Sequence, residues 1–380
     1  MLFLKCTKGV VDMTKFRAFL DRKDIHPSLH TYFIDAMGSM ALGLFASLLI
    51  GTIFSTLYKY IGVAILKDLA DCATAVTGAA LGIAIANALH APTLVMLCAA
   101  AVGYAGNGFG GTFVLGGVEK TVTAGPAGAL IAVIVAVELG KMVSKETKID
   151  ILVTPIVTIL SGVLVAQLTC PLIAWCMYWI GWFINTATVM QPIIMGILVS
   201  AAVGIALTLP ISSAAICAMI GITGLAGGAA VAGCCANMVG FAVLSFRENG
   251  WGGLVSQGLG TSMLQMGNIV RNPKIWIPAI VTSAITGPIA TCIFKLQMNG
   301  AAVNSGMGTC GLCGPIGVWT GWVAPSEAAI ANGAVAIQPG AMDWIGLIMV
   351  CFVLPAVICW AIGLLCRRLG WIREGDLKLD

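Results

Sequence analysis

The main pattern along the chain is a series of long apolar runs, separated by short polar or glycine-rich breaks. The hydrocarbon core of a bilayer is ~30 Å thick and needs ~20 apolar residues per helix, so each such run predicts one crossing. We expect ten crossings. They cover residues 32–57, 73–89, 93 into the break at 103–113, 122–139, two halves of 149–184, 192–209, 221–244, 275–296 and 344–365.

Two parts of this pattern depend on single residues. The run 149–184 is about 36 residues long, which is too long for one crossing. Pro171 lies inside it and lacks the amide donor that a continuous helix uses, so we expect a helical hairpin divided there. The charged residues Lys59, Lys67, Asp68 and Asp71 predict a loop outside the cell between the first two crossings.

Basic residues predict which side each end of the chain faces. Residues 1–30 are basic, and Phe16, Phe19 and Leu20 have the spacing of a short amphipathic helix at the membrane surface. The positive-inside rule places this segment in the cytoplasm. Further basic residues follow the fourth and tenth crossings, namely Lys141, Lys145, Lys148, Arg367, Arg368 and Arg373. An even number of crossings puts the basic residues after the fourth and tenth crossings on the same side as the N-terminal segment. We therefore expect residues 367–380 to form a cytoplasmic tail.

Two segments, 250–272 and 304–322, are too polar to face lipid and too apolar for a cytoplasmic loop. Irregular backbone at membrane depth is tolerated where it is buried in protein or lines a water-filled cavity. We therefore expect two re-entrant hairpins. The predicted fold class is an all-α polytopic membrane protein, with one transmembrane domain over residues 31–366 between the N-terminal segment and the tail.

Composition supports the membrane class and excludes several functions. Hydrophobic residues make up 59% of the chain and charged residues only 9%, whereas soluble domains carry about 25% charged residues. The net charge of +4 gives no reason to expect a nucleic-acid partner. We find no phosphate-binding loop, metalloprotease motif or serine-nucleophile elbow, and we expect no catalytic residue, cofactor or metal. Cys310 and Cys313 form a CGLC pair. Such a pair either carries out redox chemistry or binds a metal, or it supplies two small side chains where the backbone is tightly packed.

The candidate solute site comes from amides among the glycine-rich breaks. Polar groups at membrane depth are costly unless they line a cavity or find partners. Broken helices also expose main-chain groups that bind polar solutes. The six candidates for binding a solute are Asn107, Gln257, Asn268, Arg271, Asn304 and Glu327. The alternative is that the breaks are structural hairpins alone.

Two of these candidates have second interpretations. Arg271 either binds an anionic group of the solute with its planar guanidinium, or it holds the first hairpin closed by binding main-chain carbonyls or Glu248. Glu327 either hydrogen-bonds a polyol or stabilises a helix start after Ser326.

Four stretches together suggest a family. They are FRAFLDRKDIHPSLHTYFIDAMGSMALGLFASLLIG, GNGFGG, GNIVRNP and NSGMGTCGLCGPIG. In this order they resemble the EIIC-like membrane proteins of the bacterial phosphotransferase system. More narrowly, they resemble the stand-alone EIIC branch that includes regulators of clostridial toxin expression. The resemblance implies a homodimer of glucose-type architecture in the bacterial cytoplasmic membrane, and sugar or polyol uptake by an elevator-like movement.

The resemblance also implies that a partner IIB domain phosphorylates the sugar. We find no IIA or IIB domain in the sequence, and no counterpart of the substrate-site histidine in the second half. The leading hypothesis is a permease for a small polar solute, a sugar or sugar derivative. Any phosphorylation would come from separate IIA and IIB proteins, and the chain would be the membrane subunit of a sugar phosphotransferase without a nucleophile of its own. The alternatives are a membrane-embedded ligand sensor or regulator, and an ion-coupled transporter that uses Glu119 or Glu327.

Overall fold

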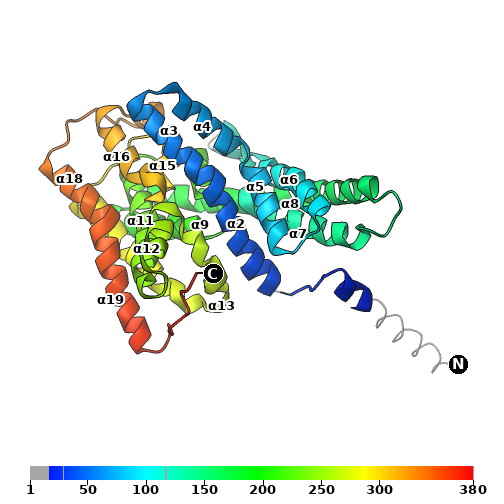
Figure 1. The fold of residues 1–380 in the computed structure, drawn as a ribbon. Coiled ribbons are helices and arrows are strands. Elements are labelled where there is room, and N and C mark those ends of the chain that lie inside the picture. The colour runs from blue at the N-terminus through cyan, green and yellow to red at the C-terminus, as the bar shows by residue number, and fades with distance from the viewer. Residues whose placement is uncertain (1–16, 29, 116–117, 380) are drawn as a thin grey trace.

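A computed structural model of the chain describes residues 17–28, 30–115 and 118–379. Residues 17–22 are helical, in agreement with the short N-terminal helix, while Phe16 lies outside the described residues. The first expected crossing is confirmed as one helical rod that begins at Thr31 and ends at Ile61. It consists of η1(Thr31–Asp35), α2(Ala36–Leu44), η2(Phe45–Leu49) and α3(Ile50–Ile61), the blue rod of Figure 1.

The stretch expected as an outside loop is instead a helix. α4(Ala64–Ala75) contains Lys67, Asp68 and Asp71, and it joins α5(Thr77–Ala88) at a bend of 48°. The loop prediction was wrong because charges three or four residues apart share one face of a helix, where they need no loop to reach solvent. The second crossing therefore belongs to a bent helix pair.

The third expected crossing corresponds to α6(Thr93–Gly108), a shorter apolar helix that ends within its glycine-rich break. The break continues into an antiparallel hairpin of β1(Gly110–Leu115) and β2(Val118–Thr123), in which Gly110 lies opposite Thr123. The all-α prediction missed this pair of strands. Alternating β-branched residues favour strands, and the hairpin packs on the next long helix, where the Phe113 ring stacks on Tyr178 with 5.2 Å between centroids.

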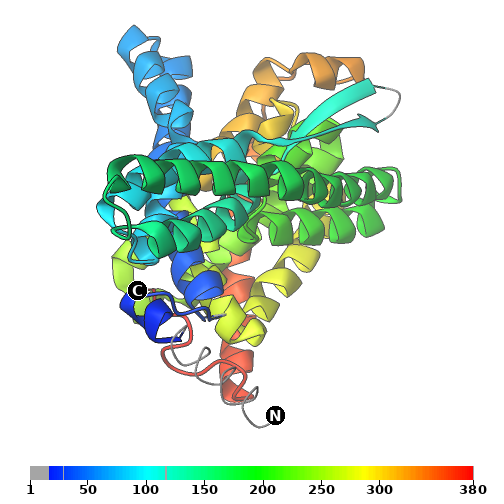
Figure 2. The same cartoon turned by 90° about the vertical axis from the view of Figure 1, so that its right-hand side faces the viewer.

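The fourth crossing is α7(Gly125–Val143), and the run after it is one helix of 39 residues, α8(Asp150–Thr188). The division expected at Pro171 is wrong. A proline removes one hydrogen bond, but neighbouring elements can hold the helix together, and α8 packs on α6, α7 and α9. At 1.5 Å per residue α8 is about 58 Å long. Figure 2 shows it lying across one face of the molecule beside α7.

The centre of the molecule is α11(Gly224–Leu244), which packs on α9(Pro192–Thr208). α11 is long and apolar enough to cross a membrane, α9 is a shorter apolar helix at the position of the expected seventh crossing, and α10(Ser213–Ile220) connects them. α11 consists mostly of Gly, Ala, Val and Cys, and small residues let helices approach closely. Its most apolar window is 89% buried, which makes it the core around which the other helices pack.

The segment 250–272 is interrupted, as expected from its composition. The elements here are α12(Phe246–Val255), η3(Ser256–Gly260), η4(Ser262–Gln265), α13(Met266–Arg271) and η5(Pro273–Trp276). The ninth expected crossing follows as α14(Ile277–Pro288) and η6(Ile289–Ile293). The backbone therefore breaks within this region, while its re-entry into the membrane stays a prediction.

The second broken segment contains three short helices. They are α15(Ala302–Ser305), η7(Cys310–Leu312) and α16(Cys313–Val323), and α17(Glu327–Ala331) follows them.

The last crossing is the left-hand, orange-to-red rod of Figure 1. It consists of α18(Ala341–Ile348), η8(Met349–Val353) and α19(Leu354–Arg368). The tail after Arg368 then turns back onto the protein and buries Ile372 and Leu377.

Six helices in the described residues are long and apolar enough to cross a membrane, or seven if the bent pair α4–α5 is one span. α6 and α9 are apolar but shorter. The expected count of ten is therefore not confirmed, and at α8 two expected crossings became one helix. The broader prediction of a mostly helical polytopic membrane protein is confirmed.

Candidate functional site

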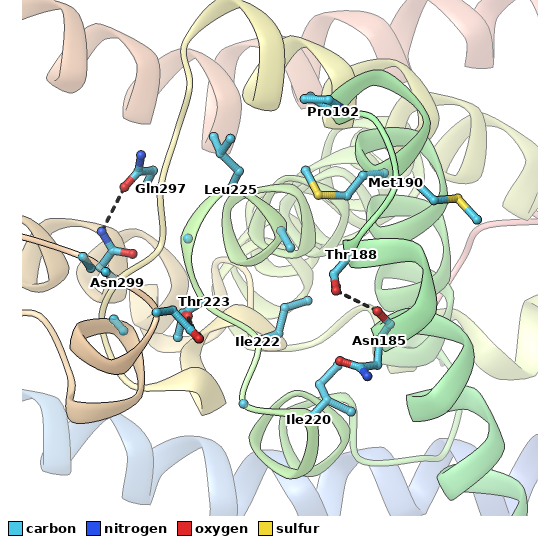
Figure 3. A pocket seen from close by; sticks show the side chains of 18 residues that line it. Asn185, Thr188, Met190, Pro192, Ile220, Ile222, Thr223, Leu225, Gln297 and Asn299 are labelled. Carbon is cyan, nitrogen blue, oxygen red and sulfur yellow. Dashed lines mark hydrogen bonds between the residues drawn. The ribbon is translucent and has the colours of Figure 1, made fainter. Parts of the chain in front are cut away.

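A polar pocket of about 660 Å³ lies at the N-terminal end of α11. The end of α8, the start of α9 and the turn between α10 and α11 form one part of its wall. Residues 297–299 and the end of α17 form the other part, so segments distant in sequence meet here. Figure 3 shows the side chains that line it.

The polar side chains of this pocket are all uncharged amides or hydroxyls. Asn185 and Thr188 lie on the side opposite Gln297 and Asn299, with Thr223 on the turn between them (Figure 3). Asn299 donates from Nδ2 to Gln297 Oε1 at 3.1 Å, which orients the two amides. No acidic, basic or histidine side chain is among the lining residues. Such a lining recognises neutral hydroxyl groups by hydrogen bonds and gives no charge to hold an ion.

Glycines explain why residues 296–299 can lie so close to α11. Gly224 and Met298 exchange two main-chain hydrogen bonds, each 3.0 Å long. Gly224 has φ +65°, a conformation that side-chain-bearing residues avoid. A Cβ atom at Gly228 would overlap the main-chain oxygen of Leu296. The glycines in GITGLAGG therefore let the extended segment pass directly over the helix start.

The start of α11 gives the pocket a polar end. The first amides of a helix have no partner within the helix and carry partial positive charge. Leu225 and Ala226, in the first turn of α11, line the pocket. The Thr223 side chain does not cap this turn, and its hydroxyl instead accepts a hydrogen bond from Asn332 Nδ2 at 3.1 Å. The electron-rich oxygen of a solute hydroxyl suits this position.

A second cavity, of about 280 Å³, lies where several helix breaks converge, and we call it the central cavity. Asn107 comes from the end of α6, Gly125 from the start of α7 and Ser212 from the turn before α10. Thr261 and Met307 come from the two broken segments. This convergence brings together the first glycine-rich break and both predicted hairpin regions, and again no charged side chain lines the space.

A buried polar network that the sequence analysis missed supports this cavity. Asn237, in the middle of α11, donates from Nδ2 to Ser283 Oγ at 3.0 Å and accepts from Trp276 Nε1 at 3.1 Å. Its Oδ1 also accepts from Thr208 Oγ1 at 3.2 Å, and Thr208 shares a 2.8 Å hydrogen bond with Ser262. The signal in the sequence was a lone amide within an apolar run, which is expensive at membrane depth unless satisfied.

The structure places the predicted candidates in different environments. Asn107 lines the central cavity. Gln257 is fully buried, donating to Ser245 Oγ at 2.8 Å and accepting from Gln265 Nε2 at 2.9 Å. Asn268 lies beside a separate cavity of about 260 Å³ that the C-terminal tail also lines.

The remaining three candidates line neither the polar pocket nor the central cavity. Arg271 is exposed at the end of α13, with Nη2 3.4 Å from His30 Nε2. Asn304 is half-buried in α15 and packs against Gly317. Glu327 is exposed at the first position of α17, where Ser326 caps the helix by accepting from Ala329 N at 3.4 Å.

The CGLC pair divides between two environments. Cys310 lines the central cavity, and Cys313 is buried at the start of α16. Within the described part of the chain, no group of three or more His, Cys, Asp or Glu side chains could hold a metal ion. Of the two, Cys310 contributes a small side chain to the cavity wall.

Comparison with known proteins fits these observations. The family described as the phosphotransferase system EIIC matches residues 34–379, which is nearly the whole chain. No curated protein and no solved structure matches the chain. The family match covers both cavities, all the candidate membrane helices and the tail. The chain therefore belongs to the phosphotransferase system EIIC family and is a multi-pass membrane permease of that type.

Proposed function

We propose that the chain moves a small neutral solute, a sugar or sugar derivative, across the bacterial cytoplasmic membrane and binds it in the polar pocket. The observation that supports this is the pocket's lining of uncharged amides and hydroxyls at the start of α11. Six polar side chains, from Asn185, Thr188, Thr223, Gln297, Asn299 and Asn332, offer donors and acceptors on several sides. A sugar presents hydroxyls in all directions, and buried polar groups are stable only when each finds a partner.

The central cavity is the second part of the proposed path. In this proposal Asn107 binds the solute, because it lines the cavity at the meeting point of the breaks, and helix ends at such breaks expose main-chain groups that bind polar solutes. The volume of about 280 Å³ is close to the lower end of known ligand pockets, ~300 Å³. A small solute fits there one molecule at a time.

Phosphorylation in this proposal belongs to separate IIA and IIB proteins, as in a stand-alone EIIC. Neither cavity offers a histidine or carboxylate that could act as a nucleophile or base on the solute. The chain holds the solute so that one hydroxyl faces the phosphoryl donor. Glu119, which an ion-coupled mechanism would use, is exposed on β2 and lines neither cavity.

We propose that the protein is a homodimer with both termini in the cytoplasm. The support for a dimer is an apolar stripe on α8, formed by Leu160, Leu164, Leu168 and Leu172. These residues are four apart and therefore share one helix face. Each side chain is at least half exposed within one protomer. A cysteine at position 168 should form a disulfide-linked dimer in native membranes, and a cysteine at the partly exposed position 169, about 100° further around the helix, is the control.

Binding to the purified protein tests the proposed site. We expect one member of a panel of hexoses, amino sugars and polyols to raise the unfolding temperature. Asn299→Ala should lower the affinity for that ligand by about tenfold, because a lost hydrogen bond that leaves a buried partner unmatched costs ~1–3 kcal/mol. Gln338→Ala, an exposed amide outside both cavities, is the matched control. Unchanged affinity in Asn299→Ala and Asn185→Ala would move the site away from this pocket.

Uptake by proteoliposomes tests the coupling. We expect phosphorylated solute inside the vesicles only when IIA, IIB and their phosphoryl donors are present outside. Accumulation of unmodified solute by the chain alone would contradict the phosphorylating version. Dependence of uptake on a proton or sodium gradient would point to ion coupling instead.

A further inference from the structure

A third cavity, of about 300 Å³, lies between the end of α11, α12 and α19, apart from the polar pocket and the central cavity. Seven of its nine lining residues are apolar, and the other two are Arg247 and Arg367. It adjoins the C-terminal end of the candidate span Ala341–Arg368. The apolar part of a membrane helix stops at this end, so the cavity lies at the level of the lipid headgroups.

The two arginines differ in their partners. Arg367 donates from Nη2 to Glu248 Oε1 at 2.7 Å and to the main-chain oxygen of Leu244 at 3.3 Å. This pairing balances its charge and fixes its side chain. Arg247 is exposed and has no hydrogen bond or ion pair with any residue in the described part of the chain. The cavity therefore holds one guanidinium whose charge is not balanced.

The walls of the cavity are large apolar side chains. Gly250, with φ +56°, breaks α12 and starts the turn that carries Trp251, which is 74% exposed. The Trp251 ring packs edge-to-face on Phe246 with 5.3 Å between centroids. Trp360 and Leu364 of α19 line the same cavity. Tryptophan and arginine together are typical of the membrane interface, where one end of a site is apolar and the other is wet.

We propose that this cavity binds one anionic glycerophospholipid. The headgroup phosphate accepts hydrogen bonds from Arg247, and an acyl chain lies against Trp251 and Trp360. A guanidinium matches a phosphate in shape and charge. A free phosphate or sugar phosphate would leave the apolar walls facing water. A zwitterionic lipid would bring an ammonium group to a site that already has excess positive charge.

Lipid binding to the purified full-length protein tests this proposal, independently of transport. Native mass spectrometry compares phosphatidylglycerol with phosphatidylcholine of the same acyl chains. The wild-type protein should retain one phosphatidylglycerol in preference to phosphatidylcholine. Arg247→Gln should weaken this binding by about fivefold, since a basic residue near an anionic lipid contributes ~1 kcal/mol. Trp360→Ala should weaken the binding of both lipids, because it removes an apolar wall of the cavity.

The matched control is Arg368→Gln, the next arginine on α19, which does not line the cavity. Its phosphatidylglycerol binding should equal that of the wild type. An equal loss in Arg368→Gln and Arg247→Gln would show a diffuse charge effect and overturn the proposed site. Equal retention of the two lipids by the wild type would also overturn it. So would competition by millimolar glycerol 3-phosphate, because the ligand would then be a small anion.

Discussion

The side-chain amide of Asn268 donates a hydrogen bond to the main-chain oxygen of Lys378, 2.8 Å away. Asn249 holds the same tail in two directions, donating to Leu377 O and accepting from Leu379 N, both at 2.8 Å. Gln265 adds a 3.0 Å bond to Leu377 O. Amides of the first broken segment and its flank thus bind the backbone of the chain's own C-terminal tail.

Removing these amides should loosen the tail. In the double variant Asn249→Ala with Asn268→Ala, the Leu379 amide loses its acceptor and Lys378 O loses its donor. Each hydrogen bond contributes ~1 kcal/mol, so we expect the tail amides to exchange hydrogen about fivefold faster or more. Hydrogen-exchange mass spectrometry of residues 371–379 measures this. Asn87→Ala, an exposed amide on α5, should leave the exchange unchanged. Equal exchange in the double variant and the wild type would contradict the proposed role of these bonds.

Asn237 should be one of the most sensitive polar positions in the protein. Asn237→Ala leaves Trp276 Nε1 and Ser283 Oγ without a partner that they have in the wild type. An orphaned buried polar group costs ~1–3 kcal/mol, so the unfolding temperature in detergent should fall by several degrees. Asn332→Ala removes one hydrogen bond from an exposed side-chain amide, and its unfolding temperature should fall by much less. Equal losses in the two variants would show that the buried network contributes little stability.

A methyl group at Gly228 should disturb the polar pocket. The added Cβ would overlap Leu296 O, so residues 296–299 must move away from α11. We expect Gly228→Ala to destabilise the protein by ~1–3 kcal/mol and to weaken solute binding. Gly38→Ala in α2 meets open space and should be neutral or stabilising by up to ~1 kcal/mol. Thermal unfolding with and without the ligand measures both effects, and normal ligand binding by Gly228→Ala would contradict the close-packing argument.

Docking of the N-terminal segment should depend on acid pH. Glu146 lies 2.6 Å from Lys23 and 2.8 Å from Arg22. The hydrogen bond from Lys23, aided by the Arg22 charge, lowers the Glu146 pKa below its ordinary value of 4.5. A lowered pKa in the folded state means that the contact stabilises docking above pH 4.5 and is lost as the pH falls through the lowered value. Hydrogen exchange of residues 22–26, corrected for intrinsic rates, should show this loss.

Glu146→Gln separates this contact from general acid effects. The variant should show the loosened segment already at neutral pH and little further change on acidification. Glu374→Gln, an exposed acid in the tail, should behave like the wild type. If Glu146→Gln kept the wild-type pH profile, another group would be responsible.

Local properties of the chain were enough for the class and for much of the helix layout. The crossing expected at 192–209 is α9, which ends at Thr208. The crossing expected at 221–244 is α11, which starts at Gly224. Both broken segments also lie where the mixed composition predicted them. A membrane helix satisfies its backbone within its own segment, so hydropathy along that segment is sufficient to find it.

Boundaries set by packing could not be read in the same way. Pro171 was expected to divide a helix, but α8 is continuous because the helices on its flanks support it. The hairpin β1–β2 lies on α8 through Phe113 and Tyr178, a contact between residues far apart in sequence. A glycine-rich break and a strand hairpin look alike until the surface that covers them is known.

The sequence by itself determined the membrane class, the order of the main helices and the resemblance to the EIIC family. Only the tertiary structure decided what each polar side chain does. Asn107 lines a cavity, whereas Asn268 donates a hydrogen bond to the main-chain oxygen of Lys378, 110 residues away in the sequence. The polar pocket likewise joins Asn185 to Asn299 from opposite sides. Hydropathy is a property of each segment, but a hydrogen bond needs two partners, and the fold chooses the second.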